Sequence, residues 1–230
     1  MSPASIIKKR KLTKEDLVLI IANLIPVYGV WFLGWNAVDA FIVYALETLI
    51  VGALTILKLA VITIFRKKDT WYNQGTSTKV SGWLFILFFT FHFGLFAAVQ
   101  TTIFSQSANI VPAGAGLLHF FFHWYSYINE DIAIMLCGFI VSYLVRSFLP
   151  FIASGEYKTI SMMRVMFQPY GRIFIQQFTV ILGSMFLELG WGKAFILIFA
   201  MVKIFFEIYV NLDHVIDKSM ENFEKENPGR

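Results

Sequence analysis

Long continuous runs of apolar residues dominate the pattern along this chain. Six runs are long enough to form helices that cross a bilayer, which takes about 20 mostly apolar residues per crossing. They cover residues 17–35, 37–65, 82–104, 132–153, 172–189 and 192–212. A transmembrane β-barrel would instead show alternating segments of about ten residues. The pattern therefore predicts an all-α fold, a polytopic membrane bundle with six transmembrane helices in a single domain over residues 1–230.

Two shorter segments between the runs predict helices that lie along the membrane surface. Residues 112–128 are apolar but too short to span the membrane comfortably, and a helix there would carry His119 and His123 on one face and aromatic side chains on the rest. Residues 159–168 are amphipathic and end just before Pro169. We therefore expect an outer interfacial helix over the first segment, which does not cross the membrane, and an inner one over the second.

The composition also favours a membrane protein. Apolar residues make up 57% of the chain and charged residues 15%, whereas a soluble domain carries about 25% charged residues. The basic segment ahead of the first run is similar to the start of a signal peptide. That run has full spanning length, however, and no cleavage site of small residues follows it. We therefore expect the first run to stay in the mature protein.

The placement of positive charge predicts the orientation in the membrane. Most of the 19 Lys and Arg residues lie before the first run, between the second and third, between the fourth and fifth, and after the sixth. The segment 106–131, on the other side, contains neither Lys nor Arg. Because positively charged loops stay in the cytoplasm, we expect both termini to be cytoplasmic, in the inner (plasma) membrane of a prokaryote. Anionic lipid headgroups account for the charge, so a nucleic-acid partner is not expected.

Ionisable residues inside the runs are the main candidates for a functional site, because a charge in hydrocarbon is costly and usually faces the bundle interior. Polar residues recur at helical spacing on five of the runs, which predicts a polar strip inside the bundle. The alternating direction of the runs places His92, Arg146 and Lys203 near the midplane. The candidates for a relay or binding site are Glu47, Lys58, His92, Gln100, Arg146, Lys203 and Glu207.

Two relationships among these candidates follow from their expected depths. Lys58 and Glu207 both fall in the inner half of the membrane, so we expect an ion pair between them. Glu47 and His92 lie on consecutive helices within a turn or two in depth, so we expect them to face the same part of the bundle. The alternative for each candidate is a hydrogen bond that only holds helices together, worth about 0.6 to 2 kcal/mol.

His119 and His123 form a candidate metal site in the outer segment. Their i, i+4 spacing lets two imidazoles meet one ion, and Glu130 and Asp131 follow nearby. A clear third ligand is missing, and two histidines at this spacing also suit an amphipathic helix at the membrane surface. Both interpretations stay open, and the sequence assigns no cofactor.

Several short motifs resemble a family of prokaryotic membrane proteins that is described only as a domain of unknown function. They are Asn23-x-x-Pro26-x-x-Gly29, Tyr44-x-x-Glu47-x-x-x-x-Gly52, His92-Phe93-Gly94-x-Phe96, Pro169-Tyr170-Gly171-Arg172 and Lys203-x-x-x-Glu207. The resemblance extends over all six predicted spans and implies no activity. The family pattern has a further histidine where this chain has Gln100, so the histidine-rich metal centre that the resemblance suggests is incomplete here.

The leading functional hypothesis is movement of a small solute or ion through a polar interior that also relays protons. Intramembrane metal-dependent or redox enzymes are one alternative, and a structural or partner-binding membrane subunit is another. Motifs for phosphate binding and nucleophilic catalysis, such as a glycine-rich phosphate loop, G-x-S-x-G and H-E-x-x-H, do not occur. The expected partners are the lipid bilayer and a small solute or ion, and self-association into a homo-oligomer is left open.

Overall fold

The computed structural model describes the chain in several stretches. They are residues 11–73, 76–107, 109–112, 114–116 and 118–210, with the single positions 218, 221, 222 and 225. Within these stretches, only the backbone is described at residues 73, 104, 107, 172, 174–181, 183, 184, 187 and 188. The end of the sixth predicted run, residues 211 and 212, lies outside the described residues.

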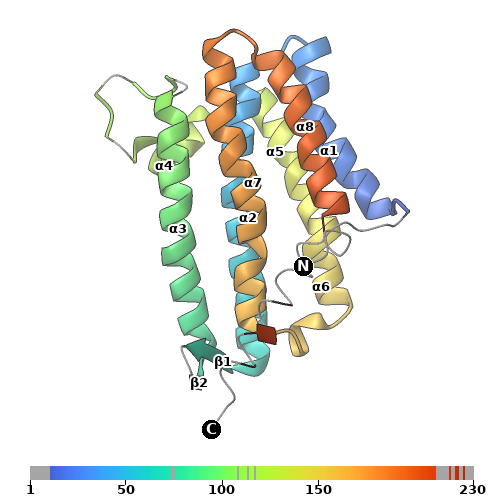
Figure 1. Cartoon of the computed structure of the whole chain (residues 1–230), viewed down its shortest axis with the longest axis vertical. Coiled ribbons are helices and arrows are strands. Elements are labelled where there is room, and N and C mark those ends of the chain that lie inside the picture. The colour runs from blue at the N-terminus through green and yellow to red at the C-terminus, as the bar shows by residue number, and fades with distance from the viewer. Residues whose placement is uncertain are drawn as a thin grey trace.

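Long helices in the described part of the chain run side by side as one bundle (Figure 1). They are α1 (Lys14–Phe32), α2 (Ala37–Arg66), α3 (Gly82–Ser107), α5 (Glu130–Tyr143) continued by a π-helical turn (Leu144–Phe148) and α6 (Leu149–Ala153), α7 (Met162–Glu188) and α8 (Gly192–Tyr209). Among the residues that the structure describes, four helical segments are long and apolar enough to cross a membrane: Lys14–Phe32, Ala37–Arg66, Gly82–Ile103 and Glu130–Ala153. A mainly helical fold with several candidate membrane-spanning helices is thus confirmed.

Polar residues at the helix starts explain where the helices begin. Thr13 and Asp16 form a capping box at the start of α1, in which each side chain accepts a hydrogen bond from the other residue's backbone N–H. Asn36 and Asn129 cap α2 and α5. Each side-chain oxygen accepts a hydrogen bond from one backbone N–H of the helix that it caps. The Asn129 amide also donates to Asp39 Oδ2 at 2.8 Å, which joins the starts of α2 and α5.

A two-stranded antiparallel sheet was not expected, and the all-α prediction is wrong in this respect. Strands β1 (Lys68–Asn73) and β2 (Thr76–Ser81) form a hairpin between α2 and α3, at what we call the hairpin end of the bundle (Figure 1). Their Thr, Trp, Tyr and Val side chains favour extended backbone. Asp69 ties the hairpin to α7, because its Oδ2 accepts from Arg66 at 2.6 Å and from the Met162 backbone N–H at 2.7 Å.

The outer segment is less helical than its composition suggests. Helix α4 covers only His119–His123, and a 3-10 turn follows at Trp124–Tyr127. A helix over the whole of 112–128 is therefore wrong, since the segment contains Pro112 and Gly114, and Gly114 has a φ of 82° that a helix does not allow. Helix α3 ends and α5 begins at the same end of the bundle, so this segment connects them without crossing (Figure 1).

The predicted inner helix over 159–168 is also wrong. Residues 159–161 are not helical, and a single helix, α7, starts at Met162 and continues through Pro169. The sequence pattern placed a helix end at this proline. Proline removes only one backbone donor, and neighbouring helices of a membrane bundle compensate for the loss, so a long membrane helix tolerates it.

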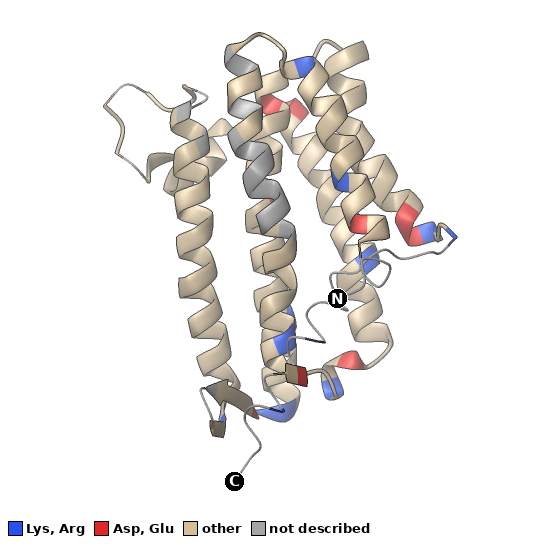
Figure 2. Ribbon diagram, in the orientation of Figure 1, with Lys and Arg blue, Asp and Glu red and all other residues tan. Residues whose placement is uncertain are grey.

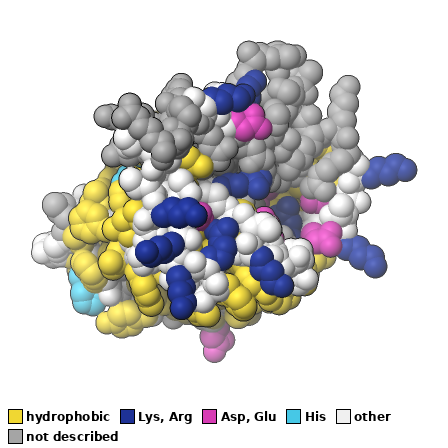
Figure 3. Space-filling model, turned by 90° about the horizontal axis from the view of Figure 1, so that it is seen from below, with side chains coloured by type: hydrophobic (Ala, Val, Ile, Leu, Met, Phe, Trp, Pro, Cys, Tyr) yellow, Lys and Arg dark blue, Asp and Glu magenta, His cyan; other side chains and the backbone are white. Residues whose placement is uncertain are grey.

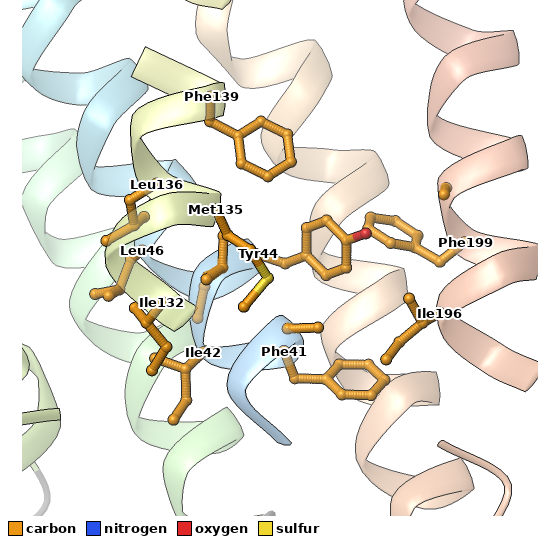
Figure 4. Close-up of a cluster of buried hydrophobic side chains, with 14 of the residues drawn as sticks. Phe41, Ile42, Tyr44, Leu46, Ile132, Met135, Leu136, Phe139, Ile196 and Phe199 are labelled. Atoms are coloured by element: carbon orange, nitrogen blue, oxygen red, sulfur yellow. The ribbon is translucent and has the colours of Figure 1, made fainter. Parts of the chain in front are cut away.

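Helix α2 lies between two clusters of buried side chains. It packs against α5 and α8 on one side and against α3 and α7 on the other. The first cluster includes Tyr44, Phe139 and Phe199 from α2, α5 and α8 (Figure 4). The second includes Phe89 and Phe93 of α3 with residues of α2, α6 and α7. The two sides differ in charge. Helix α3 contains no Lys, Arg, Asp or Glu, whereas charged residues lie at the start of α1 and at several positions along α8 (Figure 2).

Candidate functional site

A buried ion pair joins α2 to α8. Lys203 Nζ donates to Glu47 Oε2, and both side chains are almost fully enclosed, at 6% and 1% exposure. Glu47 also accepts a hydrogen bond of 2.6 Å at Oε1 from the hydroxyl of Tyr143 on α5. Both charged residues lie about ten positions from the starts of their helices, or ~15 Å along the axis, which is half the ~30 Å thickness of a hydrocarbon layer.

Aromatic rings complete the surroundings of the Lys203 ammonium. Its Nζ lies 4.3 Å from the ring centre of Phe139 and 5.5 Å from that of Tyr44. Aromatic faces attract cations, and the attraction grows when water is excluded. The cation is therefore held by a carboxylate and by two aromatic rings.

Three more charged residues extend this pair toward the hairpin end. Glu207, one turn after Lys203 on α8, has Oε1 at 3.9 Å from Lys203 Nζ and Oε2 at 3.3 Å from Arg146 NH1. The other end of the Arg146 guanidinium lies 3.5 Å from Oδ1 of Asp16, a buried residue of α1. We call these five residues the ion network: Asp16, Glu47, Arg146, Lys203 and Glu207.

The ion network contains more acidic than basic groups. It has three carboxylates and two cations, and two further basic residues, Lys58 and Arg164, line the adjoining cavity. Charges in a low-dielectric interior are stable only when they are paired. The contacts of the network therefore depend on one another.

A cavity of about 380 Å³ gives access to this network. It lies between α2, α5, α6, α7 and α8 toward the hairpin end and is not fully enclosed. Its lining includes Tyr143, Arg146 and Glu207. Lys58 and Ser147 also line it, and Lys58 Nζ donates to Ser147 Oγ at 2.7 Å. Lys and Arg side chains gather on the face of the molecule at this end (Figure 3).

On the far side of the ion pair the interior is aromatic. The ring centres of Tyr44 and Phe199 are 4.5 Å apart, and those of Phe41 and Phe195 are 5.5 Å apart. Figure 4 shows Tyr44, Phe139 and Phe199 pointing toward one another from α2, α5 and α8. All of these rings are buried. The polar path from the cavity through Tyr143 therefore ends at Glu47 and Lys203.

The π-helical turn Leu144–Phe148 positions two residues of the cavity, Arg146 and Ser147. A π turn adds a residue to the helix and rotates the side chains that follow, and such turns are frequent at functional sites. Arg146 belongs nearer the hairpin end than the midplane assigned from the sequence, because it lies only seven residues before the end of α6. The apolar pattern of this run has no signal for the π turn.

The structure brings together some of the residues predicted from the sequence. Glu47, Arg146, Lys203 and Glu207 belong to one network. Lys58 and Glu207 line the same cavity. The contacts described for the Glu207 carboxylate are with Arg146 and Lys203. The expected ion pair between Lys58 and Glu207 stays a prediction. Asp16 and Tyr143 were missed. The spacing Thr13-x-x-Asp16 is typical of a helix start and not of an ion pair, and a tyrosine inside an apolar run gives no signal.

His92 and Gln100 lie elsewhere. His92 Nδ1 is 2.6 Å from the Tyr170 hydroxyl on α7, beside the second cluster, so His92 and Glu47 do not face the same part of the bundle as expected. The reason is that α2 presents Glu47 to α5 and α8, whereas α3 packs on its other side. Gln100 is fully buried, and neither its Oε1 nor its Nε2 has a hydrogen-bond partner among the residues that the structure describes.

The histidines of the outer segment stack on each other. The rings of His119 and His123 are 4.4 Å apart, and His123 Nδ1 lies 3.0 Å from the His119 backbone oxygen. Within the described part of the chain, no group of three or more His, Cys, Asp or Glu could hold a metal ion. Nearby, burial raises the pKa of the Tyr127 hydroxyl, so this group stays protonated at neutral pH. The metal hypothesis therefore gains no third ligand.

Apolar helices of spanning length around a buried ion network are typical of a helical membrane protein. The chain belongs to a family of unknown function (DUF6498), whose model matches residues 6–227. The resemblance noted from the sequence motifs, to a domain of unknown function, is thereby confirmed. Comparisons with curated proteins and with solved structures found no match.

Proposed function

We propose that this protein moves a small solute or ion across the membrane and that protons drive or gate the movement through the ion network. One observation carries this proposal: a cavity of about 380 Å³ reaches Tyr143, whose hydroxyl hydrogen-bonds the carboxylate of a buried ion pair near mid-depth. A polar route from one surface to a titratable pair, closed beyond it by aromatic rings, is the arrangement that alternating access requires.

The proposal places the hairpin end in the cytoplasm of a prokaryote, with α7 and α8 crossing the inner membrane alongside the four helical segments named above as long and apolar enough to do so. Support comes from the charges at the two ends of the bundle. Lys67, Lys68, Lys79 and Lys158 lie at the hairpin end, whereas Lys193 lies at the opposite end, at the start of α8. Basic residues concentrate on the cytoplasmic side of membrane proteins, so the cavity would face inward.

The spacing of the ion network suggests how a proton would act on the cavity. When Glu47 binds a proton, Lys203 loses its closest counter-ion. Glu207 is then its nearest carboxylate, at 3.9 Å, and a shift of about 1 Å makes a direct contact. Glu207 would thereby be drawn from Arg146, which lines the cavity. Protonation at mid-depth would thus change how strongly Arg146 attracts an anionic group in the cavity.

The test is proton flux into liposomes that contain the purified protein and an entrapped pH-sensitive dye. A potassium gradient with valinomycin sets the membrane potential, and gradients of sodium, chloride, phosphate or acetate are added one at a time. We expect the wild type to carry protons faster than empty liposomes with at least one of these ions. Glu47→Gln, which keeps size and polarity but cannot titrate, should lose this flux.

Glu130→Gln is the matched control, because Glu130 is exposed at the start of α5, outside the cavity and the ion network. It should carry protons at the wild-type rate. The proposal is wrong if wild type and Glu47→Gln give the same flux under every gradient. In that case the buried pair holds helices together, and the protein is better described as a structural membrane subunit.

A further inference from the structure

His92 is the candidate residue that the proposed function does not use. It lies ten residues after the start of α3, or ~15 Å from the hairpin end of that helix, which is close to the middle of the hydrocarbon layer. The residue is only half-buried. Its neighbours are aromatic, with the Phe88 ring stacked at 5.3 Å and the Phe96 ring edge-on at 5.2 Å.

The contact with Tyr170 assigns the proton on the imidazole. If Nδ1–H donated to the tyrosine oxygen, both the tyrosine O–H and Nε2 would lack partners among the described residues. If Tyr170 donates to Nδ1 instead, only the Nε2–H is left without a partner. The second arrangement satisfies more groups, so His92 is the tautomer with its proton on Nε2.

The Nε2–H of His92 is exposed on the side of the bundle. It makes no hydrogen bond to any described residue, and it is not among the enclosed polar atoms that lack one. A donor that faces hydrocarbon costs several kcal/mol unless something accepts its hydrogen bond. The position therefore calls for an acceptor that arrives from within the membrane.

The rings that contact His92 on α3 indicate the shape of that acceptor. Phe88 is 40% exposed and Phe96 47% exposed. Contacts between membrane helices favour small residues that let backbones approach closely, and large rings prevent this. A flat molecule, in contrast, stacks well on rings of this kind. Helix α3 has no charged residue, so nothing on it favours an ionic ligand.

We infer that His92, Tyr170 and the surrounding phenylalanines form a binding site for a flat, lipid-soluble carbonyl compound of the quinone type. The Nε2–H of His92 donates to the carbonyl oxygen, and Tyr170 fixes the tautomer that makes this donation. Phe88 and Phe96 supply the stacking surface. This site lies on the α3 and α7 side of α2 and is separate from the cavity and the ion network.

The test is saturable quenching of tryptophan fluorescence by decyl-1,4-benzoquinone, with the protein in phosphatidylcholine nanodiscs. Empty nanodiscs and the variants measure the quenching that comes from quinone dissolved in the lipid, and this part is subtracted from the signal. We expect His92→Phe, which keeps a ring but removes the donor, to weaken binding at least tenfold, as loss of one hydrogen bond in an apolar site does. His92→Gln offers an N–H and should retain more of the affinity. His123→Phe, in the outer segment, should bind like the wild type.

Two results would overturn the inference. One is equal saturable binding by the wild type and His92→Phe, which would place any quinone elsewhere. The other is a dimer of the wild type, seen by native mass spectrometry, that dissociates in His92→Phe and does not respond to quinone. A second copy of the chain would then be the acceptor.

Discussion

Removing the cation of the buried pair should harm the protein more than removing the anion. In Lys203→Met the side-chain volume is kept, but Glu47 retains only the Tyr143 hydroxyl from its described contacts. Breaking a buried pair in this way costs about 3 to 5 kcal/mol. In Glu47→Gln the amide oxygen still accepts from Tyr143, and Lys203 keeps Glu207 and two aromatic rings. We expect a loss of about 1 to 2 kcal/mol, near that of one or two hydrogen bonds.

The double variant Glu47→Gln/Lys203→Met separates pairing from packing. Both members of the pair are gone, and Glu207 still has Arg146 as its counter-ion. We therefore expect the double variant to be more stable than Lys203→Met alone. Its loss should fall short of the sum of the single losses by about 2 kcal/mol or more, which is the coupling expected of side chains in direct contact.

Reversible unfolding in bicelles, monitored by steric trapping, measures these free energies of unfolding. Lys193→Met is the matched control, because Lys193 lies on the same helix but is exposed, and such changes stay within about 0.5 kcal/mol. The reasoning fails if Lys203→Met costs no more than Lys193→Met. It also fails if the two single losses simply add in the double variant, because the two side chains would then not depend on each other.

Two further predictions test the packing and the cavity. Gly52→Ala should lower stability by about 1 to 3 kcal/mol, because the new Cβ would lie 2.5 Å from the Phe93 ring. Gly94→Ala, which has open space at its Cβ, should not lower stability. Thermal unfolding in detergent compares the two variants. In a Cys137→Ala background, Ser147→Cys in the cavity should react with a membrane-impermeant maleimide added from the hairpin side, and Met201→Cys, on an exposed apolar face, should not. Labelling of Ser147→Cys only from the opposite side would contradict the inward-facing cavity.

The apolar runs were sufficient to predict most of the helices. In five of six cases both boundaries of the run lie within a few residues of those of the helix, because an uninterrupted apolar stretch leaves the backbone no other way to satisfy its hydrogen bonds in lipid. The exception is α7, where Pro169 was interpreted as a helix end. The hairpin β1–β2 was missed because the segment between the two apolar runs was treated only as a loop, although its Thr, Trp, Tyr and Val residues favour extended backbone.

The candidate site could be predicted only as a set of residue types. Glu47, Lys203 and Glu207 were identified because charge in an apolar run is rare. Their partners depend on which faces of the helices meet. This is decided by packing between residues that are far apart in the sequence. The spacing of residues along the chain does not show that the π turn changes the direction of Arg146. It also does not show that α3, with His92, packs on the side of α2 opposite to Glu47.

The described contacts of the ion network link α1, α2, the π-helical turn and α8. The Glu47–Lys203 contact is direct, whereas the contacts described for Glu207 and Arg146 lie between 3.3 and 3.9 Å. In the proposed function, a shift of about 1 Å would bring Lys203 from its 3.9 Å spacing into hydrogen-bond contact with Glu207. A single proton on Glu47 would then be felt at Arg146, two contacts away, where the cavity is open to a solute.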